Sequence, residues 1–510
     1  MRFVAGIVLL FAFFLTPSLL AQQVYKGWPL SARVEEEESK KAAAIANALQ
    51  AGSIDKATFD AYFTRYYFNR WTLPDRISLL NGYVRNDFFK NDLGRATGEA
   101  RRMLLDVTVR AMRRMKSDPN VYPVAQLNAL VVLGNLYEDP GKTTPYGPAI
   151  PVLIEEFRRD KAPLANQIAA LDGLVRYAYL GIADSRLRDQ ELPALFIAVV
   201  TEEEVPEGRD EEIHTLFFRA RAVEGLGALC RNAKPAPGES AESLTAVVET
   251  LLTILESRTE KNEVRNNAMN AFAELNLIAA SAGGVELDPA RIVDAIVSFA
   301  RMTCDRQQRV IDEARRSEQA STSGGMGRGM GTMSGGMGPM GGGMGPMVGG
   351  MGTMGGGMGT MGGGMGTMGL SSGNDKMIRR TEECIGSSKF AFGVVKNAIR
   401  GLSGSRNETS IIALLNKENA AANAGTVRML QEIEKNIDEY ITFLNKGPPV
   451  NRRQQTQQRG VGTPMMGGPL SAGSTTTAAR GTNMPRVTMD DIHNELTVLA
   501  TKFDELKNRG

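Results

Sequence analysis

The sequence predicts an all-α protein with a helical-repeat, α-solenoid-like body, low-complexity tethers and coiled-coil-like C-terminal helices. Three observations lead to this prediction. Apolar residues recur at helical spacing through most of the 510-residue chain. Sustained alternation of apolar and polar residues, bounded by hairpin turns, is missing. Two segments without helical periodicity, one of them built almost entirely from Met, Gly and Thr, separate the helical parts.

The composition is that of an ordinary globular chain, with 42% hydrophobic and 23% charged residues. Lys and Arg number 59 and Asp and Glu number 57, which leaves a formal net charge of +2. So small a net charge generates no overall field that would attract nucleic acid or an acidic membrane. Nucleic acid is therefore not an expected partner.

Residues 1–21 have the features of an export signal. Arg2 precedes an apolar run from Phe3 to Leu15, Pro17 interrupts that run, and Ala21 offers a small residue for cleavage before Gln22. The run is shorter than the roughly 20 residues that a membrane span requires. We expect an exported protein, periplasmic or extracellular. An uncleaved N-terminal segment that anchors the chain in a membrane is the alternative.

Residues 22–94 are expected to form N-terminal helices that carry an aromatic cluster. The cluster contains Phe59, Tyr62, Phe63, Tyr66, Tyr67, Phe68 and Trp71. Several of these side chains fall on one helical face, so packing between helices is the expected role. A stacking platform for carbohydrate or nucleic-acid bases is the alternative.

Residues 95–320 are expected to form the repeat body, because similar apolar ladders recur along them. The ladders are Leu127-Leu130-Leu133-Leu136, Ile168-Leu171-Leu174, Val223-Leu226-Leu229 and Met269-Phe272-Leu275, with matching positions roughly 41 to 55 residues apart. Small residues accompany them, and another apolar helix precedes each one. A single helix pair cannot bury its own apolar face, so stacked neighbours must build the core.

The segment Val264–Phe272 resembles the second helix of a HEAT or armadillo repeat, and the likeness extends over about residues 95–302. The resemblance implies a body that binds other macromolecules along a curved surface. A non-repeating helical domain is the alternative, because the spacing of the ladders is irregular.

Two low-complexity segments are expected to be disordered linkers, one rich in Met and Gly at 321–373 and one rich in Gln, Thr, Gly and Pro at 448–487. A helical module at 374–447 lies between them, with helices near 375–402 and 407–445. The Met thioethers are soft ligands that suit copper, so copper binding or buffering is an alternative role for the first segment.

Residues 488–510 are expected to form a terminal helix with a heptad seam. Its apolar positions alternate in steps of three and four: Met489, Ile492, Leu496, Leu499, Phe503 and Leu506. The upstream helix carries the same spacing at Val427, Leu430, Ile437, Ile441 and Leu444, and Ile433 and Tyr440 widen its stripe. Matching seams predict that the two helices pack together, within one chain or between two copies. These residues are the candidate interface. Thr488 and Asp491 predict a capping box.

Catalytic residues, cofactor-binding residues and metal ligands are not expected from any motif. His214 and His493 lack the spacing of a zinc site, and Gly134 to Lys142 does not fit a phosphate-binding loop because six residues separate Gly134 from Gly141. The three cysteines, Cys230, Cys304 and Cys384, are expected to be buried thiols. A disulfide between Cys304 and Cys384 is left open.

Taken together, these features predict a non-enzymatic exported scaffold or adaptor that binds an unknown protein partner through helical surfaces, with self-association through the C-terminal helices as one possibility. Soft-metal binding by the Met-rich segment is the second hypothesis. An enzyme whose site cannot be recognised from the sequence is the third.

Overall fold

The computed structural model describes residues 25–53, 55–202, 204–206, 209–232, 239–323, 373–400, 411–419, 421, 423–446 and 487–509. The expected export signal, the Met/Gly-rich tract at 324–372 with its alternative role in copper binding, and the segment 447–486 lie outside these residues. Within the described part, the secondary structure is helical without any strand, apart from one isolated bridge between Tyr137 and Pro145. The predicted all-α fold class is confirmed.

The chain forms two compact units. The first contains residues Met1–Phe299 and Val394–Leu430, and the second contains Ala300–Gly393 and Gln431–Gly510. Three long helices contribute residues to both units: α18 (Pro289–Ser323), α19 (Gly373–Arg400) and α21 (Ala424–Lys446). The segment boundaries expected from the sequence stay a prediction.

The first unit begins with the predicted N-terminal helices. They are α2 (Ala32–Ser39), α3 (Ala42–Ala51), α4 (Lys56–Tyr62), η1 (Phe63–Tyr67), α5 (Phe68–Arg70), η2 (Pro74–Arg76), α6 (Ile77–Leu79), η3 (Leu80–Val84), α7 (Arg85–Asp87) and η4 (Phe88–Asp92). Three of these segments, η1, η3 and η4, are π-helical turns. Each such turn holds an extra residue and rotates the helix face, which lets the nearby Tyr66 and Phe68 both be buried. The aromatic cluster is core, as expected.

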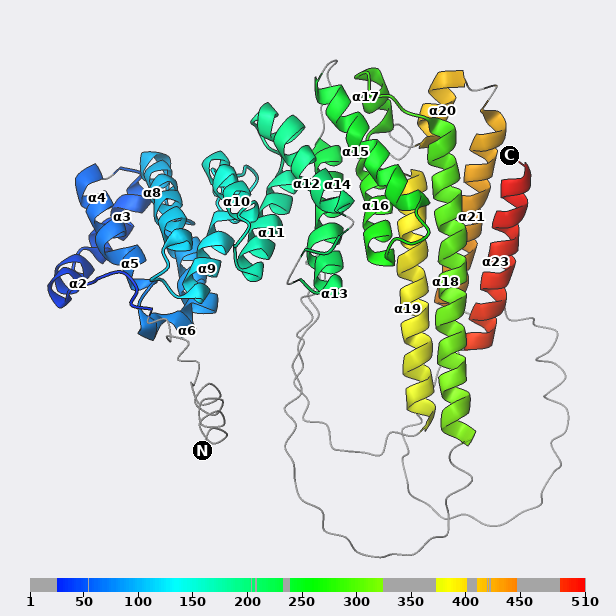
Figure 1. Ribbon diagram of the computed structural model, residues 1–510, viewed down its shortest axis with the longest axis horizontal. Helices are drawn as coiled ribbons and strands as arrows, with labels where there is room; N and C mark the ends of the chain where they lie inside the picture. Colours follow the sequence, from blue (N-terminus) through cyan, green and yellow to red (C-terminus); the bar gives the residue numbers. More distant parts are fainter. Residues whose placement is uncertain are drawn as a thin grey trace, which may run out of the picture. The chain divides into compact units, whose positions relative to one another are not determined.

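The body follows as stacked helix pairs (Figure 1). Its main helices are α8 (Gly98–Ser117), α9 (Pro123–Leu133), α10 (Ile150–Phe157), α11 (Leu164–Leu180), α12 (Leu192–Thr201), α14 (Ala220–Asn232), α15 (Glu239–Glu256) and α16 (Asn262–Glu274). Shorter segments complete it: η5 (Gly147–Ala149), η6 (Leu187–Glu191), α13 (Glu211–Ile213), η7 (His214–Arg219), α17 (Leu277–Ala282) and α20 (Ile411–Asn419). Helix α9 packs on α11, α11 on α14, and α14 on α16, while α8, α10, α12 and α15 pair with these four.

The stacking follows from the ladders and the small residues beside them. Gly134 and Gly173 bring the end of α9 against α11 so closely that a Cβ atom on Gly134 would lie 2.7 Å from the Gly173 Cα. Polar contacts also link successive helix pairs. Asn232 donates to the Ala178 carbonyl at 2.7 Å, and Asn267 donates to the Ala220 carbonyl at 2.8 Å. Each helix pair is therefore joined to the next by both apolar and polar contacts.

The second unit is a four-helix bundle of α18 from Ala300, α19 to Gly393, α21 from Gln431, and α23 (Met489–Arg509). Thr488 and Asp491 form the predicted capping box of α23: the Thr488 hydroxyl accepts from the Asp491 amide, and the Thr488 amide donates to the Asp491 carboxylate.

The expectation of a single helix near 407–445 is wrong, because the structure has two separate helices there, α20 and α21. The Asn423 side chain donates to the Leu415 carbonyl at 2.9 Å, and the Asn423 carbonyl accepts from the Val427 amide. An Asn that caps both helix ends in this way favours a break over a continuous helix.

Candidate interaction surfaces

The candidate interface on α23 faces the interior of the bundle. Five of its residues are at most 6% exposed: Met489, Ile492, Leu496, Leu499 and Phe503. The side chain of the sixth, Leu506, lies outside the described part of the structure. The charged and polar residues of α23 lie at its margins. This seam is thus covered within a single chain.

The upstream seam on α21 is buried as a wide stripe, as predicted, except at Ile441. Val427, Leu430, Ile437 and Leu444 are buried, whereas Ile441 is only half-buried. Two other apolar residues, Ile433 and Tyr440, are at most 3% exposed and belong to the inward face. Val427 and Leu430 lie in the first compact unit and the others in the second.

Polar contacts fix how α23 lies in the bundle. Towards α21, Lys502 donates to the Asn436 side chain at 3.0 Å and pairs with Glu439. Towards α18, the pairs are Arg301–Asp504, Gln308–Thr497 and Arg315–Asp490. Residue numbers rise along α18 as they fall along α23, so these two helices are antiparallel.

The bundle interior holds a buried polar layer. Gln307 is 1% exposed, accepts from the Ser388 hydroxyl at 3.2 Å and donates to Ser387 at 3.3 Å. Tyr440 lies in the same region and packs edge-to-face on Phe392. Burial raises the pKa of Tyr440 well above its ordinary value, so its hydroxyl stays protonated. A polar layer of this kind favours one register of the helices over others.

The thiols are buried, as expected from the sequence. No disulfide joins Cys230, Cys304 and Cys384, all of which belong to the described residues. Burial raises the pKa of Cys230 to about 12, and it raises the pKa of Cys304 further still. Thiols held protonated in this way are poor nucleophiles and poor metal ligands.

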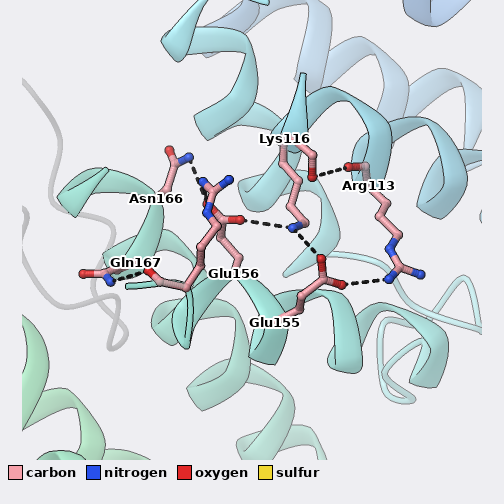
Figure 2. Close-up of polar contacts among 8 residues, drawn as sticks. Arg113, Lys116, Glu155, Glu156, Asn166 and Gln167 are labelled. Atoms are coloured by element: carbon pink, nitrogen blue, oxygen red, sulfur yellow. Dashed lines mark hydrogen bonds and ion pairs between the residues drawn. The ribbon is translucent and has the colours of Figure 1, made fainter. Parts of the chain in front are cut away.

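The body contains a buried charge network that the sequence did not reveal (Figure 2). Lys116, on α8, has a side chain that is only 1% exposed and lies 3.1 Å from Glu156 on α10, whose side chain is fully buried. Glu156 also pairs with Arg159 at 2.5 Å and accepts from Asn166 at 3.2 Å. Because every charge in this network has a partner of opposite sign, burial is compensated. The network joins two successive helix pairs.

Arginines on the polar side of α8 have partners within the protein. Arg110 pairs with Asp60, and Arg113 pairs with Glu155 at 2.8 Å (Figure 2). The guanidinium of Arg114 lies 4.3 Å above the Trp28 ring. These three arginines therefore make contacts within the protein.

The residues that resemble a phosphate-binding loop form an ordinary surface turn. The Asp139 carboxylate accepts from the amides of Thr143 and Thr144, which lowers the pKa of Asp139 to about 2. No helix begins at Lys142, so the backbone amides do not converge on a phosphate position. Arg101 binds the carbonyls of Tyr137, Glu138 and Asp139 and holds the start of the turn.

A few large apolar side chains remain exposed. Two of them, Leu79 and Tyr83, lie one turn apart on α6 and η3 and are 40% and 75% exposed. Others are Val205, Phe217, Phe390 and Val498. In the described part of the chain, no group of three or more His, Cys, Asp or Glu side chains is placed to hold a metal ion. No helix in that part is long and apolar enough to cross a membrane.

Comparison of the chain with protein-family models, with curated proteins and with solved structures found no match.

Proposed function

We propose that this protein is an exported, non-catalytic scaffold or adaptor that binds another protein through the outer surfaces of its helical body. The observation that carries the proposal is the stacking of α9, α11, α14 and α16, each of which packs on the next. Stacked helix pairs leave an extended row of outer helix faces and loops, which is the surface that repeat proteins use to bind macromolecules.

The charged side chains of the body support this role. Several of them form ion pairs between helix pairs rather than a cluster in a pocket. Arg219 pairs with Glu260 at 2.5 Å, and Arg231 pairs with Glu274 at 2.7 Å. These ion pairs hold neighbouring helices in place. A rigid stack loses little conformational freedom when it binds a partner.

The first surface to test is the exposed pair Leu79 and Tyr83, because η3 packs against α9 at the start of the stack. These two side chains form a small exposed apolar pair, and aromatic residues often dominate the binding energy of interfaces. Tyr83 is 75% exposed, so truncation or charge reversal there removes few contacts within the protein.

The proposal is tested by affinity purification of the full-length chain from its native host after mild cross-linking, followed by reconstitution with purified components. We expect one stoichiometric protein partner, and a loss of at least tenfold in its affinity for Leu79→Asp with Tyr83→Asp. Phe390→Asp, which changes a side chain that is 64% exposed on α19, is the matched control. If no stoichiometric partner is recovered, the adaptor role is wrong. If a partner binds both variants equally, only the assigned surface is wrong.

A further inference from the structure

The first described residues of the chain lie in a socket formed by residues that come later in the sequence. We use "strap" for residues 25–29 and "socket" for Asn69, Thr72, Arg114, Asp118 and Asn120. All of them belong to the first compact unit. The strap is not part of a helix, and its contacts reach residues about 40 to 90 positions further along the sequence.

The backbone of the strap is held by hydrogen bonds to the socket. The amides of Lys26 and Gly27 both donate to the Asn120 carbonyl at 3.1 Å. Gly27 has a φ of +67°, and a Cβ atom there would lie 2.3 Å from the Thr72 carbonyl oxygen, so only glycine fits. After the tryptophan, the Pro29 carbonyl accepts from the Asn69 side chain at 3.1 Å.

Trp28 is the anchor of the strap and is 3% exposed. Its indole N–H donates to the Asp118 carboxylate at 2.9 Å, and its amide donates to the Thr72 hydroxyl at 2.7 Å. The Arg114 guanidinium covers the ring at 4.3 Å. A socket with a cation above the ring and a carboxylate at its edge selects tryptophan, because phenylalanine has no N–H and tyrosine places its hydroxyl elsewhere.

Contacts within the body hold the socket in shape independently of the strap. Asp118 accepts from the amide of Asn120 at 2.9 Å, and its carbonyl accepts from the Gln126 side chain at 2.8 Å. The Thr72 hydroxyl donates to the Asn69 carbonyl at 2.8 Å. These bonds do not involve the strap, so the recognition groups should keep their positions when the strap leaves.

We propose that the socket is a peptide-binding site for a segment with Gly-Trp-Pro at its centre, turned at the glycine, and that the strap is its ligand in cis. A partner protein carrying such a segment would compete with the strap for the socket. The inference goes beyond the adaptor role, because it concerns a site on the N-terminal part of the body and holds whether or not the outer helix faces bind anything.

The test uses the full-length chain carrying Trp28→Ala, which removes the anchor and leaves the socket intact. The probe is a fluorescein-labelled synthetic peptide with the sequence of residues 22–31, followed by anisotropy. We expect the variant to bind this peptide at least tenfold more tightly than the wild-type chain does, because the intact strap occupies the wild-type socket. Peptides in which alanine replaces the glycine or the tryptophan should bind at least tenfold more weakly.

Asp118→Asn added to Trp28→Ala should weaken peptide binding, whereas Arg76→Gln added to it, a change outside the socket, should not. If Trp28→Ala fails to fold, Gly27→Ala is used instead, because its Cβ lifts the strap without removing the ring.

A concentration-dependent dimer of wild type that Trp28→Ala abolishes would support the site and identify a second copy's strap as the ligand. Equal binding of the peptide by wild type and variant, or no binding by either, would overturn the proposal.

Discussion

At the scale of single residues, the contact between Lys116 and Glu156 has a large expected effect on stability. Both side chains are almost fully buried, so the loss of one charge leaves the other without full compensation (Figure 2). We predict that Lys116→Met lowers the free energy of unfolding by about 3 kcal/mol, the usual range for breaking a buried pair. Urea denaturation followed by circular dichroism measures the difference.

The matched control lies one helical turn earlier. Arg113→Met removes a pair with Glu155 in which the side chains are 61% and 50% exposed, so it should cost less than about 1 kcal/mol. Equal losses from Lys116→Met and Arg113→Met would mean that the buried network does not stabilise the junction between α8 and α10.

Asp92 should make the stability of the N-terminal helices depend on pH. Burial raises its pKa to about 6, Asp87 acts in the same direction, and Tyr67 and Arg95 act in the opposite one. The folded state then holds its proton more tightly than the unfolded state, so stability is fully present below about pH 4 and is lost as the pH rises towards 6. The loss is at most about 3 kcal/mol.

Asp92→Asn should remove this dependence, as measured by urea denaturation between pH 4 and 7 against wild type. Tyr67→Phe should shift the dependence to higher pH, because the Tyr67 hydroxyl donates to Asp92 and stabilises its charged form. A wild-type curve that runs parallel to that of Asp92→Asn would contradict the assignment.

At the scale of elements, α23 shows how a short terminal helix becomes stable. A helix of about 20 residues is marginal alone in water, and α23 gains its stability from a buried face and from ion pairs on both flanks. We predict that Leu499→Asp with Phe503→Asp lowers helicity and releases α23, because these side chains are 3% and 1% exposed.

The measurements are far-ultraviolet circular dichroism and hydrogen exchange, with amide protection in α21 at 431–446 as the second readout. Val498→Asp is the matched control, because this side chain lies on the same helix and is 50% exposed. Wild-type protection in the double variant would show that the seam does not hold the bundle together.

At the scale of the whole molecule, the sequence predicts the helices and their buried faces, which depend on apolar periodicity. It does not predict the contacts between residues that lie far apart along the chain. The ladders at Leu130 and Leu171 predict helices and their buried faces, because apolar spacing depends on local geometry. The burial of Lys116 is invisible in the sequence, since a lysine next to an apolar stripe is normally solvated. Trp28 and Asp118 meet only after folding, so no spacing rule relates them.

The stripe on α21 is as wide as the sequence predicts, with Ile433 and Tyr440 buried beside the heptad positions, and only Ile441 departs from the prediction. A strict heptad favours Ile441, whereas the structure buries Tyr440 more deeply, because a helix packed in a bundle buries a stripe wider than one heptad line. The polar layer around Gln307 and Ser388 also lacked a sequence signal, since each residue is unremarkable alone.

The repeat organisation of the body itself is testable at one close contact. We predict that Gly173→Val destabilises the body by about 2 kcal/mol, because a Cβ atom at this position already lies 2.9 Å from both the Gly134 Cα and a methyl group of Leu153. Gly386→Val in α19 is the propensity-matched control, since nothing lies within 4 Å of its Cβ position.

In a stack, each helix pair contacts only its neighbours. Hydrogen exchange should therefore show lost protection in α9, α10 and α11, with α15 and α16 close to wild type. Uniform loss from α8 to α16 would instead show a single cooperative domain, the alternative to repeats.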